Sequence, residues 1–160
     1  MAQAQRRRIT LERTYRTTPK EVWELWTTAD GIEAWWGPDG FEVKVRRLDL
    51  RPGGELDYTM TAIAPDQIEF LKQAGMKLST EHRVTFVEVS SQRRLAYTMM
   101  ADFIPGVEPY EVSTVVEFEP APGGVKLMVT FDAMHDDRWT QLATMGWESQ
   151  LARLAKLLET

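Results

Sequence analysis

The sequence predicts an α+β domain in which one curved antiparallel sheet packs against a long C-terminal helix. Apolar and polar residues alternate in several segments between residues 9 and 131, as in strands that bury one face. Two helix-start patterns follow the first of these segments. From about Asp136 to Leu158, apolar residues recur at helical spacing. A helix with one apolar face needs an apolar partner, and the concave face of a curved sheet supplies it.

The N-terminal part of the chain predicts one strand followed by two short helices. Alternation from Ile9 to Tyr15 predicts the strand. Thr18 then starts a helix, because its hydroxyl can cap free amides, a proline follows at the first helical position and Glu21 completes a capping box. Asp30 begins the same capping pattern again. It predicts a second short helix that ends at residues 37–38, a glycine followed by a proline.

The middle of the chain reads as a run of antiparallel strands joined by turns. A turn is predicted at Pro52 and Gly53, since proline and glycine suit the two central positions of a type II turn. A hairpin is predicted around residues 120–124, which contain two prolines and two glycines. Alternation predicts strands over residues 41–45, 55–60, 83–89, 94–101, 112–118 and 125–131.

One segment interrupts the strand pattern. Asp66 offers an N-cap, Ile68 and Leu71 share a helical face, and Gly75 is a suitable C-terminal stop. We therefore predict a short inserted helix over residues 66–75.

The chain ends in its longest predicted helix. At about 100° per residue, its apolar residues form one stripe. Gln150 lies in the middle of that stripe, and Gly146 is one of its members. The stripe comprises Trp139, Leu142, Ala143, Gly146, Trp147, Leu151, Leu154 and Leu158.

Composition narrows the class of protein. The 160 residues suffice for one domain with its own core. A net charge of −5 argues against nucleic acid as a partner, and no apolar run is long enough to span a membrane. The chain has no cysteine, and its first residues lack the apolar core of a signal peptide, so we expect a cytoplasmic protein. His82 and His135 have no partner at metal-ligand spacing, and we expect no metal and no cofactor.

Four of the six tryptophans, at positions 23, 26, 35 and 36, fall within one short window. Together with the first strand, the capped helix at Thr18, the turn at residues 49–54 and the late pair of Gly146 and Trp147, this window resembles the START/SRPBCC superfamily. Within it, the chain is similar to the family of the activator of the 90-kDa heat-shock-protein ATPase. The resemblance covers about residues 9–158 and implies that residues 1–160 form a single domain.

The resemblance implies the helix-grip fold, in which the sheet wraps around the final helix and leaves a cavity between them. It says little about chemistry, because such folds host binding proteins, cyclase-like enzymes and co-chaperones. Two segments depart from the family pattern, the helix over 66–75 and the apolar loop over 103–109. Both are expected near the mouth of the cavity.

Gly146 and Gln150 are the first candidate site residues. They lie four residues apart and face the same way, into the apolar stripe. Glycine inside a helix costs about 1 kcal/mol relative to alanine, so its presence needs a reason. Gly146 could leave space for a ligand that Gln150 orients. Close packing of helix and sheet, with Gln150 bonded to the backbone, explains the pair equally simply.

The aromatic and methionine residues give the remaining candidates. Trp26 and Trp36 are interpreted as core, whereas Trp23 and Trp35 could be core or stack on a ligand. Residues that alternate on two predicted strands are candidates for the sheet side of a pocket. The complete predicted lining is Trp35, Tyr58, Met60, Tyr97, Met99, Gly146, Trp147 and Gln150.

Three functions follow, in order of preference. The first is binding of a hydrophobic or aromatic small molecule in the cavity. The second is a cyclase- or hydrolase-like enzyme that uses the same pocket, although no catalytic motif is present and no catalytic residue is assigned. The third is a co-chaperone-type interaction domain with a role in the stress response. The interpretation allows a homodimer and ranks a chaperone partner below a small-molecule ligand.

Overall fold

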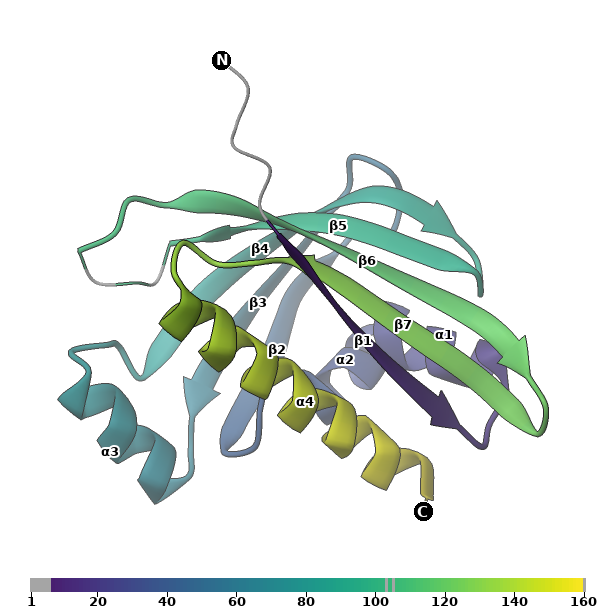
Figure 1. The fold of residues 1–160 in the computed structure, drawn as a ribbon, viewed down its shortest axis with the longest axis horizontal. Helices are drawn as coiled ribbons and strands as arrows, with labels where there is room; N and C mark the ends of the chain where they lie inside the picture. Colours follow the sequence, from purple (N-terminus) through teal and green to yellow (C-terminus); the bar gives the residue numbers. More distant parts are fainter. Residues whose placement is uncertain (1–6, 103, 105, 160) are drawn as a thin grey trace.

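The computed structural model describes residues 7–102, 104 and 106–159, and within them one antiparallel sheet arches over a long helix (Figure 1). The predicted α+β helix-grip fold is confirmed. The sheet has seven strands in the order β1-β7-β6-β5-β4-β3-β2. The strands are β1 (Arg8–Tyr15), β2 (Phe41–Leu48), β3 (Glu55–Ala62), β4 (Ser79–Ser90), β5 (Arg94–Ala101), β6 (Tyr110–Ala121) and β7 (Gly124–Asp132). The helices are α1 (Pro19–Thr27), α2 (Ala29–Trp35), α3 (Pro65–Gln73) and α4 (Asp137–Glu159).

The first strand is paired with the last one. β1 and β7 run antiparallel with Tyr15 opposite Val125, and the chain between them supplies the other strands by successive hairpin connections. The Tyr15 hydroxyl donates a hydrogen bond to the Leu151 carbonyl on α4 at 3.2 Å. This bond ties the sheet to the buried half of the final helix.

Helices α1 and α2 follow β1 as predicted, but α2 begins earlier than its sequence pattern indicated. Thr18 caps α1 by accepting a hydrogen bond from the Glu21 amide at 3.1 Å. Thr28, not Asp30, caps α2 and accepts from the Gly31 amide at 3.0 Å. A threonine hydroxyl, like an aspartate carboxylate, can accept the hydrogen bond of a free amide at the start of a helix. Thr28 also closes α1, so one residue joins the two helices.

The inserted helix α3 forms within the β3–β4 connection. Its N-cap is Ala64, which makes no side-chain capping bond, and not the predicted Asp66. Pro65 instead occupies the first turn, where its missing amide costs nothing. Gly75 does end the helix, with φ at +72°. Gly53 has φ at +84°, as the predicted turn requires.

Helix α4 lays its apolar stripe on the concave face of the sheet. Asp136 caps it by accepting from the Trp139 amide at 2.8 Å. Leu151 and Leu154 are fully buried, whereas Ala143, Gly146 and neighbouring stripe residues of the first half are only half-buried. The helix is therefore packed tightly near its C-terminal end and loosely near its start.

Most strands extend beyond their predicted limits. β6 continues to Ala121 and β7 starts at Gly124, so the hairpin turn is narrower than the predicted 120–124. In the apolar loop over 103–109, Phe103 and Pro105 lie outside the described residues, and Ile104 is buried.

Within the described ranges, no helix combines the length and apolar character needed to cross a membrane.

Candidate functional site: the pocket beneath helix α4

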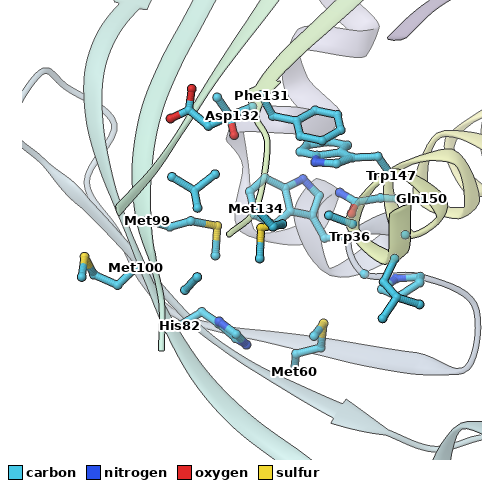
Figure 2. Close-up of a pocket in the computed structure, with 18 of the residues that line it drawn as sticks. Trp36, Met60, His82, Met99, Met100, Phe131, Asp132, Met134, Trp147 and Gln150 are labelled. Carbon is cyan, nitrogen blue, oxygen red and sulfur yellow. The ribbon is translucent and has the colours of Figure 1, made fainter. Parts of the chain in front are cut away.

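A pocket of about 300 Å³ lies between the first half of α4 and the concave face of the sheet (Figure 2). Three groups of residues line it. The loop after α2 contributes Trp36, Gly37 and Pro38. The sheet and the segment after it contribute Tyr58, Met60, His82, Tyr97, Met99, Met100, Ala101, Val112, Thr114, Phe131, Asp132 and Met134. Helix α4 contributes Trp139, Leu142, Ala143, Gly146, Trp147 and Gln150.

The predicted site residues gather in this pocket, with one exception. Those that line it are Tyr58, Met60, Tyr97, Met99, Gly146, Trp147 and Gln150. A Cβ atom placed on Gly146 would have no heavy atom within 4 Å, so the helix faces free space there. Close packing against the sheet, the simpler of the two explanations of Gly146, is therefore wrong.

Trp35 is the exception, and Trp36 takes the place predicted for it. Trp35 is fully buried, and its Nε1 donates to the Leu25 carbonyl at 2.8 Å. Its ring packs at 4.8 Å, edge to face, against the core residue Trp26. Trp35 is the last residue of α2, whereas Trp36 is its C-cap with extended backbone. The break in helical geometry sends the two neighbouring side chains in different directions, which helical spacing alone cannot reveal.

Trp36 connects the loop to the floor of the pocket. Its ring meets Tyr58 edge to face at a centroid distance of 5.4 Å and lies at 33° to Tyr97 at 6.2 Å. Trp147 approaches from α4, with its ring stacked on Phe131 at 5.8 Å and on Trp26 at 6.0 Å. The pocket is thus enclosed by aromatic faces from the loop, the sheet and the helix.

Arg153 holds the loop in position. Its Nη1 donates to the carbonyl of Gly37 at 2.8 Å and to that of Pro38 at 3.2 Å. The Asp39 amide donates to Ser149 Oγ at 3.0 Å, also on α4. Sequence reasoning placed Arg153 and Ser149 outside the apolar stripe and assigned them no role. No local pattern in the sequence indicates which side chain will donate hydrogen bonds to the backbone carbonyls of a distant loop.

His82 is a pocket residue that sequence reasoning missed. It is buried, stacks on Tyr58 at 5.1 Å and shares a 2.7 Å hydrogen bond between its Nε2 and the Thr80 hydroxyl. Burial lowers the pKa of His82 below its usual value, against the opposing charge of Asp102. The alternation of His82, Val84 and Phe86 on β4 could have revealed its inward orientation.

Polar atoms are few in this pocket. Thr114 lies opposite Tyr97 on the neighbouring strand, and burial raises the pKa of both Tyr97 and Tyr58. Both phenols therefore remain neutral at physiological pH. Gln150 projects from α4 into the pocket (Figure 2), and its amide has no hydrogen-bond partner among the described residues. The alternative explanation of Gln150, a bond to the backbone, is thus wrong for this structure.

The pocket wall is interrupted where β4 and β5 separate. Their ladder runs from Ser90 opposite Arg94 to Val84 opposite Met99, although β4 begins at Ser79. A polar depression on the outer face of the sheet shares His82, Met99 and Met100 with the pocket.

Over the described part of the chain, no group of three or more His, Asp or Glu side chains is arranged to hold a metal ion.

Solved structures share this fold. Protein CV1439 from Chromobacterium violaceum is 24% identical with a TM-score of 0.78, covering 96% of this chain and 97% of that one. The AHSA1-like protein from Aeromonas hydrophila is 24% identical with a TM-score of 0.71, covering 96% and 92%. The AHSA1 protein SPO3351 from Silicibacter pomeroyi is 19% identical with a TM-score of 0.73, covering 96% and 98%. At these identities, the likeness establishes the fold alone.

The family is established by the sequence itself. Comparison with curated proteins gives no match. A family model described as "Activator of Hsp90 ATPase homolog 1-like protein" matches residues 16–159, nearly the whole chain. The resemblance to the START/SRPBCC superfamily is thereby confirmed, and the chain belongs to the activator of Hsp90 ATPase homolog 1-like family.

Proposed function

We propose that this chain is a cytoplasmic protein that binds an apolar or aromatic small molecule in the pocket beneath α4. The observation that carries the proposal is the free space at Gly146, in the middle of the apolar face that α4 turns toward the sheet. Protein interiors are normally packed without such gaps. A pocket of about 300 Å³ is at the lower end of the range of known small-molecule sites.

The chemistry of the lining supports the same ligand class. Aromatic faces from Trp36, Trp147 and Phe131 favour a flat apolar body, and thioethers such as Met60 and Met99 adapt to irregular shapes. Removing apolar surface from water supplies the driving force, about 25 cal/mol for each Å² buried.

The same tyrosines weigh against the enzymatic alternative. An enzyme in this pocket would need a tyrosine or carboxylate that exchanges protons near neutral pH. Burial moves the pKa of Tyr58 and Tyr97 upward, away from that range. Both phenols then act as hydrogen-bond donors and not as bases, which suits a binding role.

Equilibrium dialysis with fluorene, a rigid tricyclic hydrocarbon, tests the proposal. We expect saturable binding at one site per chain. Gly146→Leu fills the free space, so it should weaken fluorene binding at least about ten-fold, the loss expected when about 1.4 kcal/mol of contact is removed. Ala152→Leu adds the same side chain at an exposed position of α4 and should leave affinity unchanged. Absence of fluorene binding to the wild-type chain, or full affinity in Gly146→Leu, would refute the proposal.

A further inference from the structure

Two buried tyrosines line the pocket and contact the same tryptophan ring. Tyr58 comes from β3 and Tyr97 from β5, and both rings pack on Trp36. The exposed fractions of the two residues are 6% and 3%. The negative charge that one phenol would carry is close enough to raise the pKa of the other. Both side chains therefore line the pocket floor against the Trp36 ring.

The hydroxyl of Tyr58 lacks a hydrogen-bond partner among the described residues, and Tyr97 has Thr114 opposite it on the neighbouring strand. Side-chain polar atoms that are both enclosed and without a hydrogen-bond partner include Trp26 Nε1 and Trp36 Nε1. The Tyr58 oxygen is not among them, although it also lacks a partner. It thus keeps accessible surface, and the pocket that Tyr58 lines is the space beside it. An acceptor atom on a ligand could therefore take a hydrogen bond from Tyr58, and one such bond contributes about 0.5–1.5 kcal/mol net.

The charges around the pocket select a neutral acceptor. Both phenols keep their protons, because burial raises the pKa of Tyr58 and Tyr97. No lysine or arginine belongs to the described lining, so a ligand anion would meet no counter-charge there. Asp132 is already engaged, since its carboxylate accepts from the Ser113 amide at 3.0 Å and lies 3.4 Å from Arg8. A buried ion without a partner is far more costly than a hydrogen-bonded neutral group.

We propose that the pocket selects apolar molecules that carry one neutral acceptor, such as the carbonyl oxygen of an aromatic ketone, and that the hydroxyls of Tyr58 and Tyr97 donate to it. This inference rests on the proposed function and narrows its ligand class. It also assigns the two tyrosines as specificity-determining residues, while the surrounding aromatic rings supply affinity.

Fluorenone and fluorene test the inference, because they differ only by a carbonyl in place of a methylene. In a pocket without donors, the ketone binds more weakly, since its oxygen loses water and gains no hydrogen bond. With the phenols donating, we expect fluorenone to bind at least about five-fold more tightly than fluorene, as one net hydrogen bond provides. The measurement is the ratio of the two dissociation constants by equilibrium dialysis.

Variants that lack single hydroxyls assign the donors. Tyr58→Phe should lower the ratio to one or less, and Tyr97→Phe should reduce it in the same direction. Fluorene affinity should be unchanged in both, which checks that the pocket is intact. Tyr15→Phe is the matched control, because Tyr15 bonds the Leu151 carbonyl outside the pocket and its loss should leave the ratio unaltered.

The possible outcomes distinguish failure of the proposed ligand binding from failure of the proposed carbonyl preference. If neither compound binds, the proposed function itself fails. If fluorene binds as tightly as fluorenone or more tightly, ligand binding stands and the carbonyl preference is overturned. If the preference survives both phenylalanine variants but disappears in Gln150→Leu, the assignment of the tyrosines as donors is overturned.

Discussion

Replacing Arg153 by methionine should destabilise the protein by about 2 kcal/mol. The guanidinium donates to the Gly37 carbonyl at 2.8 Å and to the Pro38 carbonyl at 3.2 Å, and its side chain is 24% exposed. Hydrogen bonds from a charged donor contribute about 1.5–3 kcal/mol, and water can reach the site and replace part of that loss. Methionine keeps the apolar length of the side chain. The change therefore removes the donors with little loss of packing.

Thermal and urea unfolding would measure the effect. For a chain of this size, about 2 kcal/mol lowers Tm by about 4–8 °C. Arg138→Met is the matched control, because Arg138 is exposed near the start of the same helix, and its replacement should change stability by less than about 0.5 kcal/mol. Fluorene affinity should also fall in Arg153→Met, since the loop that it holds lines the pocket. Equal stability of Arg153→Met and wild type would show that the hydrogen bonds from Arg153 to the loop carbonyls do not hold the loop in solution.

Three further predictions concern two glycines and a histidine. Gly146→Ala should raise stability by about 1 kcal/mol, because alanine is the better helix former and its Cβ meets nothing. Gly54→Ala should lower stability by about 1–3 kcal/mol, because a Cβ there collides with the Asp49 carbonyl oxygen; urea unfolding that ranked the two variants the other way would disprove the packing argument. Burial lowers the pKa of His82 in the native state, so its contribution to stability is complete above about pH 6.5 and is lost as the pH falls below that value. His82→Gln should therefore lose less Tm than wild type between about pH 7.5 and about pH 5.5, and identical losses would contradict this account.

The sequence predicted the fold well because its signals are local. The alternation in the strands, the cap at Thr18 and the stripe on α4 each depend on residues close together in the chain. Two of the errors occurred where residues close together in the chain offered similar chemistry. Thr28 and Asp30 can both cap a helix, and Trp35 and Trp36 can both fill apolar space.

The site was harder to predict because its decisive contacts are long-range. Gly146 and Gln150 stood out because they break the apolar stripe, which is a local signal. The hydrogen bond between Arg153 and the Gly37 carbonyl joins residues 116 positions apart. That Tyr58 and Tyr97 line the same pocket follows only from the order of the strands in the sheet. His82 was missed because its strand was predicted to begin one residue after it.

The pairing of β1 with β7 has a consequence for how the chain is made. Among the described strands, β1 has β7 as its ladder partner, so it can pair only when residues 124–132 have emerged from the ribosome, more than 100 residues later. Until then the backbone amides of β1 form hydrogen bonds with water or with a temporary partner. Because loop closure must precede such distant pairing, the sheet should form slowly and only after β7 has been synthesised. The pocket is completed later still, when α4 brings Arg153 to the loop.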